Sequence, residues 1–131
     1  MTTNIHVHNM TPHPINMILI NGLENGISIK YDSEGVIRAK QQDTLGEFIE
    51  TDLELNNSSC GVSIPVIHSK YGEPEGIPDD INKNDIYIVS LLAYKSLKEN
   101  GYDMTPFYCV AGTVRDSEGR IIGCSGISKP E

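Results

Sequence analysis

Arg115 and Arg120 flank the tetrapeptide Asp116–Gly119 near the end of the chain. A guanidinium group presents paired N–H donors whose geometry matches a phosphate, whereas the ammonium group of lysine acts as a point charge. If both side chains project from the same side of a hairpin, they can hold a phosphorylated ligand. The alternative is a solvated hairpin end, where the arginines pair with the neighbouring aspartate and glutamate.

His13 lies between two prolines in the segment Thr11–Pro14. Two prolines favour extended φ values and remove two backbone donors, so we expect a stiff bend here. A rigid backbone around a polar side chain suits ligand binding or acid–base chemistry. His13 and Thr11 are therefore candidates for contact with a ligand, His13 with its ribose or phosphate. The alternative is that both residues only form the turn.

Ser90 ends the β-branched and aromatic run Asp85–Ser90, which predicts a buried strand. It precedes Leu91–Asn100, where apolar residues recur three and four apart as in a helix. A strand that leads directly into a helix places free N–H groups and the positive end of the helix dipole together, a favourable position for phosphate or carboxylate. The alternative is that Ser90 only caps its helix. No glycine-rich loop precedes the helix, which excludes a P-loop or dinucleotide fingerprint.

Tyr71 begins a stretch that also holds a flexible glycine and two carboxylates, Glu73 and Glu75. Its ring can stack on a base or a sugar. Carboxylates two residues apart in a proline-containing loop are usually solvated, so we do not assign them paired acid–base chemistry. Tyr71 is therefore a candidate for contact with a ligand, and catalysis by the paired carboxylates is the less favoured interpretation.

His6 and His8 are two residues apart on an expected strand, so their side chains share one face. That is one geometry for a metal ion. No third ligand follows at this spacing, although His68 could join in three dimensions, and surface histidines are the alternative. We predict neither a metal site nor a cofactor.

The three cysteines are Cys60, Cys109 and Cys124. Their number is odd, and no pair has the two-residue spacing of a zinc or redox motif. We expect reduced, buried thiols that act as small apolar residues. Cys109 and Cys124 are similarly distant from the turn between their strands and could face one another.

The composition limits the class of protein and its compartment. The chain has 131 residues, 38% hydrophobic and 21% charged, which suits a single domain over residues 1–131. The net charge of −8 argues against a binder of bulk nucleic acid, which needs a basic face. No run of some eighteen apolar residues predicts a membrane span, and the first residues lack the pattern of a signal peptide. We expect a cytoplasmic protein without membrane contact.

The first part of the chain predicts an antiparallel meander. Apolar residues alternate in Asn4–Met10, and further strands are expected at Ile15–Asn21, Ile27–Tyr31 and Val36–Lys40. Gly22–Gly26 reads as a hairpin loop, and Asp32–Gly35 as a turn of the same sequence as Asp116–Gly119. We interpret both copies of the tetrapeptide as hairpin turns of the same kind, in which Asp caps the backbone and Gly adopts a positive φ.

The middle of the chain is less informative. We expect one strand around Phe48–Leu55, a loop at Asn56–Ser59, an edge strand or bulged strand at Gly61–His68, and an acidic surface loop at Lys70–Asn84.

The last part predicts a strand–helix–hairpin unit over Asp85–Ile127. Gly101 stands where the helix should end in a left-handed residue, and strands at Cys109–Val114 and Ile121–Ile127 flank the second Asp-Ser-Glu-Gly turn. The sequence therefore predicts an α+β fold, mainly antiparallel, with one clear helix at about residues 91–100.

Several motifs occur in an order that resembles a widespread group of small bacteriophage and prophage proteins with an N-terminal Asn-Leu-Thr-Pro-His motif. They are Asn9–His13, Tyr71–Glu73 with Glu75–Pro78, Tyr87–Ser90, and Val114–Asp116 with Gly119–Gly123. The resemblance covers about two thirds of the chain. It departs at Met10, where the group has leucine, and in the longer Gly22–Lys40 region. It implies a phage setting rather than a mechanism.

In that setting, small proteins often bind and withhold a signal of host immunity. We therefore expect a phage-type binding protein that sequesters a small phosphorylated, nucleotide-derived ligand without turnover, often as a homo-oligomer. The arginines would bind phosphate and Tyr71 a base. The predicted site residues are Thr11, His13, Tyr71, Ser90, Arg115 and Arg120.

Two alternatives stay open. The first is a protein-interaction module that inhibits a host protein or belongs to the virion, with the acidic loop Glu73–Asp85 as its contact surface. The second is a nucleotide hydrolase or lyase that uses His13 as general acid or base. No signature of a known enzyme class appears, so an enzyme is the less favoured interpretation.

Overall fold

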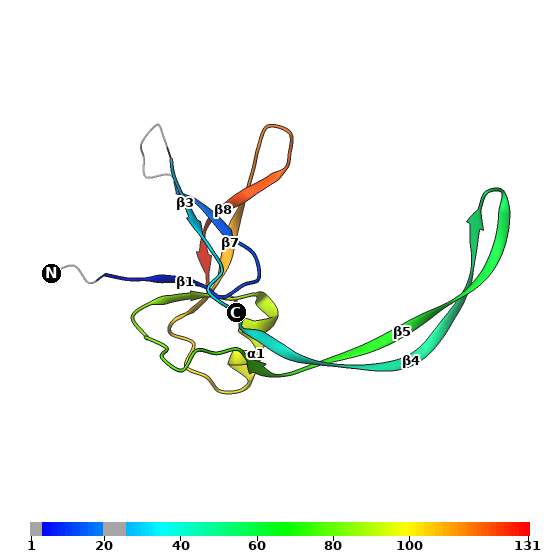
Figure 1. Ribbon diagram of the computed structural model, residues 1–131, viewed down its shortest axis with the longest axis horizontal. Helices are drawn as coiled ribbons and strands as arrows, with labels where there is room; N and C mark the ends of the chain where they lie inside the picture. Colours follow the sequence, from blue (N-terminus) through cyan, green and yellow to red (C-terminus); the bar gives the residue numbers. More distant parts are fainter. Residues whose placement is uncertain (1–3, 20–25) are drawn as a thin grey trace. The chain divides into compact units, whose positions relative to one another are not determined.

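The computed structural model describes residues 4–19 and 26–131. The elements are β1 (Val7–Asn9), β2 (Ile15–Leu19), β3 (Ile27–Tyr31), β4 (Arg38–Leu55), β5 (Ser58–Glu75), β6 (Ile86–Ile88), α1 (Leu91–Glu99), β7 (Phe107–Arg115) and β8 (Ile121–Ser128) (Figure 1). The contacts divide the chain into a core unit, Met1–Ala39 with Glu73–Glu131, and a hairpin unit, Lys40–Gly72. The single domain expected from the sequence stays a prediction, since compact units need not fold separately.

In the core unit, the described strands form a six-stranded sheet in the order β1-β6-β7-β8-β2-β3. The two ends of this sheet approach one another. Asn9 of β1 forms a parallel bridge with Ser33, just after β3. The Glu34 amide donates to the Asn9 carbonyl at 2.9 Å, and the Ile37 amide to the Met10 carbonyl at 3.0 Å. The sheet is therefore nearly closed.

The sheet is mixed, so the prediction of a mainly antiparallel fold is wrong in part. Among the described strands, β1 and β6, β6 and β7, and β8 and β2 pair in parallel, while β7–β8 and β2–β3 are antiparallel. The physical reason lies in β6–α1–β7. A helix between two neighbouring strands carries the chain back to the starting edge, and the second strand then runs parallel to the first.

β6 lies at the centre of the core, and its alternating side chains pack on two sides. Tyr87 and Val89 pack with Leu97 of the helix in one buried cluster. Ile86 and Ile88 pack in a second cluster with residues of β2 and β8. Burial of both faces confirms the strand expected from the β-branched run.

The helix begins and ends as the sequence predicts. The Ser90 hydroxyl accepts a hydrogen bond from the Ala93 amide at 3.2 Å, and Gly101 has a φ of +78°. The buried face, however, centres on Ala93, Tyr94 and Leu97, and Leu91 and Leu92 are about half exposed. Both leucines lie in the first turn, rotated away from the side that contacts the sheet. The apolar spacing in the sequence included them, so the buried side of the helix is narrower than that spacing suggests.

The β7–β8 hairpin is confirmed. Oδ1 of Asp116 accepts from the amides of Glu118 and Arg120, each at 2.9 Å, and Gly119 has a φ of +81°. Cys109 pairs with Ser128 and Cys124 with Thr113, so the two cysteines do not face one another as expected. Cys124 lies four positions from Ser128, the partner of Cys109, and the register shift at Val114/Arg115 accounts for only one of them. The rest arises because Cys109 lies farther along the chain from the centre of the turn than Cys124. Both thiols are buried and free, whereas Cys60 is exposed.

The other copy of the tetrapeptide, Asp32–Gly35, does not form a hairpin turn. Ser33 bridges to β1, so this segment joins the two ends of the sheet and then leads into β4. Tertiary pairing with β1 overrides the local turn signal. The expected loop Gly22–Gly26 lies, apart from Gly26, outside the described residues. The antiparallel pairing of β2 with β3 on either side of it is confirmed.

The hairpin unit consists of most of β4 and β5, each 18 residues long, which form a two-stranded ribbon (Figure 1). Asn56 and Asn57, with φ of 50° and 66°, form the two-residue turn. Two positive φ values match the twist of the strands they connect. The predicted loop at Asn56–Ser59 is therefore too long, and the strands around it are too short. The prolines of β5 are tolerated because each strand of a lone ribbon has an open edge.

Within the described residues, no helix has the length and apolar character needed to cross a membrane.

Candidate functional site

Asn9 organises the bend that carries Thr11 and His13. Its side chain is completely buried. The Asn9 amide nitrogen donates to the carbonyls of His13, at 2.8 Å, and of Tyr31, at 3.0 Å. Its Oδ1 accepts from the Thr11 amide at 3.0 Å and the Thr11 hydroxyl at 2.6 Å. The bend is therefore fixed by one asparagine as well as by its prolines.

Three of the predicted site residues meet beside this bend. Thr11, His13 and Ser90 line one concavity of about 330 Å³ together with apolar residues of β2, α1 and β7, among them Ile15, Leu91 and Val110. The bend supplies one wall, and the start of α1 supplies the other. Sequence reasoning found these residues separately, and only folding brings them together.

The chemistry of this concavity is limited but definite. The Ser90 hydroxyl already caps the helix, and the Thr11 hydroxyl is engaged with Asn9. The His13 side chain is exposed, and its carbonyl is held by Asn9. What remains for a ligand is mostly apolar wall, the His13 imidazole and the positive end of the helix dipole. A small ligand with an apolar body and one anionic group fits that arrangement.

The two arginines lie elsewhere, at the tip of the β7–β8 hairpin. Arg115 Nη1 donates to the Gly119 carbonyl at 2.8 Å. Arg120 pairs with Asp116 at 3.0 Å and with Glu118 at 2.8 Å. Arg115 is five positions along β7 from Val110, or roughly 16 Å. These contacts match the solvated hairpin end, and the arginines do not line the concavity.

Tyr71 belongs to the hairpin unit, where its ring is about 44% exposed. The six predicted site residues are therefore distributed over three places: the concavity, the hairpin tip and the hairpin unit. A ligand role for all six residues stays a prediction.

A polar site that the sequence did not predict surrounds His8. Its Nε2 lies 2.9 Å from Oδ2 of Asp85, and its Nδ1 lies 2.9 Å from Oε1 of Glu34. The centroid of the His8 ring lies 4.4 Å from that of Tyr87, with the two planes tilted by 31°, and the His6 amide donates to Asp85 at 3.2 Å. His8, Glu34, Asp85 and Tyr87 border a concavity of about 420 Å³. The residues are up to 79 positions apart, so no local spacing could reveal them.

The charges around His8 favour its protonated form. Burial alone would lower the pKa of His8, but the hydrogen bonds to Asp85 and Glu34 outweigh it, and the pKa is raised. The hydrogen bond from His8 lowers the pKa of the Asp85 carboxyl in turn, although burial opposes this. Asp85 is only 8% exposed, so the pair is largely shielded from water.

The contacts of His8 therefore support a structural role. In the protonated form, with a carboxylate at each ring nitrogen, both nitrogens donate, and no lone pair is left to accept a proton or bind a metal. Among the described residues, no three His, Cys, Asp or Glu side chains are placed to hold a metal ion. His68, considered above as a further ligand, pairs with Glu47 at 3.0 Å in the hairpin unit.

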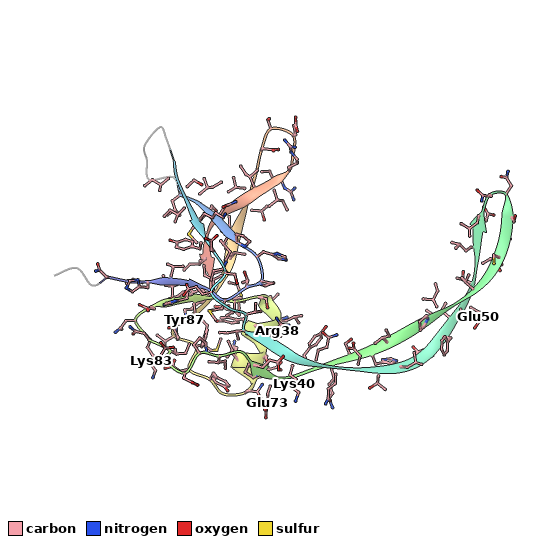
Figure 2. All side chains as sticks on the ribbon, viewed as in Figure 1. Arg38, Lys40, Glu50, Glu73, Lys83 and Tyr87 are labelled. Atoms are coloured by element: carbon pink, nitrogen blue, oxygen red, sulfur yellow. The ribbon has the colours of Figure 1, made fainter. Side chains whose placement is uncertain are left out.

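The outer half of the hairpin unit, residues 49–64, has two chemically different faces. The Ser63 hydroxyl donates to Glu50 at 2.6 Å, which places these side chains on one side of the ribbon (Glu50 is labelled in Figure 2). Because side chains alternate along a strand, the neighbours of these residues point to the opposite side. We call the first side the acidic face (Glu50, Asp52, Glu54, Ser59, Ser63). The second side carries Thr51 and Ser58 as well, and we call it the apolar face after its other residues (Ile49, Leu53, Leu55, Cys60, Val62, Ile64).

The apolar face is open to solvent. Ile49, Leu53, Leu55 and Ile64 are each 48–56% exposed. A lone two-stranded hairpin is marginally stable in water, and exposed apolar side chains gathered on one side are typical of a surface that is covered by another element or molecule. The sequence predicts a strand on each side of the turn, around Phe48–Leu55 and at Gly61–His68, but not that the two strands pair and share this face.

Comparison with known proteins identifies no relative: no family model, no curated protein and no solved structure matches the chain.

Proposed function

We propose that the protein is a protein-interaction module that binds its partner through the apolar face of the hairpin unit. The observation that carries this proposal is the exposure of Ile49, Leu53, Leu55 and Ile64 on one side of the ribbon. Hydrophobic burial is the dominant favourable term in most protein association, and these side chains are available for it.

The arrangement of the ribbon supports the same proposal. Three or more strands, or a covering element, are needed before a hairpin is independently stable. Within the hairpin unit, the two strands pair only with one another. A protein partner that covers the apolar face would supply the missing layer. The acidic loop Glu73–Asp85, expected above as the contact surface, has no comparable apolar face.

A paired set of variants tests this proposal. Leu53→Lys with Ile64→Lys places two charges on the apolar face, and Ser59→Lys with Ser63→Lys places the same charges on the acidic face. Each full-length variant is used as bait in an extract of the cells in which the protein is made, and bound proteins are identified by mass spectrometry. We expect a defined partner with the wild type and the acidic-face variant and its loss with the apolar-face variant. Equal recovery by both variants, or a wild type that binds neither another protein nor a further copy of this chain, would reject the proposal.

A second function is favoured by a separate observation, the convergence of Thr11, His13 and Ser90 on one concavity. We propose here a site for a small phosphorylated, nucleotide-derived ligand, held without turnover in the cytoplasm. The dipole of α1 supports an anionic group at Ser90, and the apolar walls support a planar base. The phage-type sponge expected from the sequence then depends on this concavity and not on the arginines.

A thermal-shift screen tests this second function. Nucleotides, cyclic oligonucleotides and cyclic ADP-ribose isomers are added to the wild type and to His13→Ala, and each ligand is examined afterwards by mass spectrometry. A ligand at a hundred times its Kd stabilises the fold by roughly 2.7 kcal/mol. We expect a shift that is lost in His13→Ala and kept in Arg115→Ala with Arg120→Ala. Loss in the arginine variant would place the ligand at the hairpin tip, and an altered ligand would indicate the hydrolase or lyase alternative.

A further inference from the structure

We propose that the partner of the apolar face is a second copy of this chain, with two hairpin units packed face to face. This inference rests on the proposed function and names its partner. In the outer half of each hairpin, residues 49–64, one side of the ribbon is apolar and the other is acidic. Two such ribbons can each cover the exposed apolar side chains of the other.

The distribution of charge permits two copies to meet in this way. The chain carries a net charge of −8, so most contacts between copies would bring carboxylates together. On the outer half of the hairpin, Glu50, Asp52 and Glu54 alternate with the apolar residues of β4 and therefore lie on the acidic face. When apolar faces meet, these carboxylates point outward into solvent. The apolar face is thus the part of the hairpin where self-association meets little repulsion.

The geometry of a ribbon also suits a two-fold pair. Sheets pack face to face at about 10 Å with side chains from both inner faces interdigitating. In an isologous contact, residue i of one copy meets residue j of the other, and residue j of the first meets residue i of the second, so one apolar face can serve both copies. The product would be four strands in two layers. Each hairpin would then have the covering layer that a single two-stranded hairpin needs to be stable in water.

The size of the face predicts how strong the pairing is. About eight residues of each strand, at roughly 3.3 Å per residue, give a length near 26 Å and a width near 10 Å. That footprint is well below the roughly 800 Å² per partner of a standard interface. We therefore expect reversible association whose extent rises with protein concentration, not a permanent dimer.

Cys60 supplies a native reporter of this contact. By strand alternation it lies on the apolar face, and its thiol is exposed. Cys109 and Cys124 are buried in the core unit and serve as internal references. Pairing should shield Cys60 from an alkylating reagent as the protein concentration increases. The rate of Cys60 alkylation should therefore fall with concentration, while the two buried thiols react slowly throughout.

Sedimentation velocity of the full chain tests the inference. The wild type is compared with Leu53→Lys/Ile64→Lys and with the matched control Ser59→Lys/Ser63→Lys over roughly a hundredfold range of concentration. We expect a concentration-dependent dimer for the wild type and the control, and a monomer for the apolar-face variant. Added salt should strengthen the dimer because it screens repulsion between two acidic chains. A basic partner protein would show the opposite salt dependence.

The outcomes separate the inference from the proposed function. A wild type that stays monomeric at every concentration and salt, with an unchanged rate of Cys60 alkylation, overturns self-pairing. If the apolar face of the wild type still binds another protein, the proposed function stands and only self-pairing is rejected. If Leu53→Lys/Ile64→Lys fails to fold, the single variant Leu53→Ser replaces it, and equal association of Leu53→Ser and the wild type would also overturn the inference.

Discussion

Nε2 of His8 lies 2.9 Å from Oδ2 of Asp85, which ties β1 to the residue that precedes β6. The other ring nitrogen pairs with Glu34, in the segment between β3 and β4. One imidazole thus joins three segments near the place where the sheet closes. Its protonation state should therefore influence the stability of the core unit.

The first prediction concerns pH. The pKa of His8 is raised above 6.5 in the folded state, so protonation of His8 stabilises the fold. This stabilisation is fully present below pH 6.5 and is lost as the pH rises from 6.5 through the pKa of His8 in the folded protein. Over that pH range we expect the Tm of the wild type to fall by a few degrees. His8→Gln should lower the Tm at acidic pH and remove this fall, and His13→Gln should keep it. A wild-type Tm that is flat above pH 6.5 would contradict the role assigned to His8.

The pH dependence has the opposite sign for Asp85. Its pKa is lowered below 3.8, so its contribution is present above that value and is lost as the pH falls through the folded pKa. We expect acid unfolding of the wild type to begin at lower pH than that of Asp85→Asn, as followed by circular dichroism. If the two proteins unfold at the same pH, Asp85 does not supply this stability.

The second prediction concerns Asn9. Asn9→Ala removes four hydrogen bonds and leaves the carbonyls of His13 and Tyr31 without this donor. We expect the free energy of unfolding in urea to fall by about 2–4 kcal/mol. Asn16→Ala is the control, because the exposed Asn16 makes only a 3.4 Å contact with the Ile122 carbonyl, and its cost should stay below about 0.5 kcal/mol. Equal effects would show that the bend does not depend on Asn9.

The third prediction compares two glycines of the β7–β8 hairpin. Gly112 and Gly119 have φ of +73° and +81°. A Cβ on Gly119 meets nothing within 4 Å, whereas one on Gly112 would collide with Oγ of Ser125. Gly119→Ala should therefore cost about 1–2 kcal/mol from backbone strain alone, and Gly112→Ala should cost more. Adding Ser125→Ala should recover part of the loss in Gly112→Ala only, as measured by urea unfolding.

The fourth prediction concerns the turn of the hairpin unit. Asn56 and Asn57 both have positive φ, and Asn-Gly is the preferred pair for such a two-residue turn. We expect Asn57→Gly to increase protection of the β4 and β5 amides in hydrogen exchange, and Asn56→Val to decrease it, because a β-branched residue is disfavoured at positive φ. Equal protection in the two variants would mean that this turn does not set the register of the ribbon.

Local features of the fold were readable from the sequence because their causes lie within a few residues. The Ser90 cap, the left-handed Gly101 and the Asp116–Gly119 turn each depend on a side chain or a φ angle near the element it ends. The strand at β6 was readable from its β-branched run. The same local signal failed at Asp32–Gly35, where pairing with β1 competes with the turn.

The site was readable only as separate residues. Thr11, His13 and Ser90 were identified one by one, and their convergence required the order of strands in the sheet, which the sequence does not show. The contact of His8 with Asp85 was missed because it joins residues 77 positions apart. The two arginines were expected to contact a ligand. In the structure, Arg115 donates to the Gly119 carbonyl and Arg120 pairs with Asp116 and Glu118, all within the same hairpin tip.

The sequence by itself determined the turn at Asp116–Gly119, the two ends of α1 and the alternation of side chains in residues 49–64, because those properties follow from side-chain chemistry at short range. The tertiary structure alone decided that β6 and β7 run parallel, that a histidine lies between two distant carboxylates, and that the apolar face of the hairpin unit remains exposed. These three features depend on which segments of the chain pack together. The packing is set by the burial of the whole core and not by the local preference of any one segment.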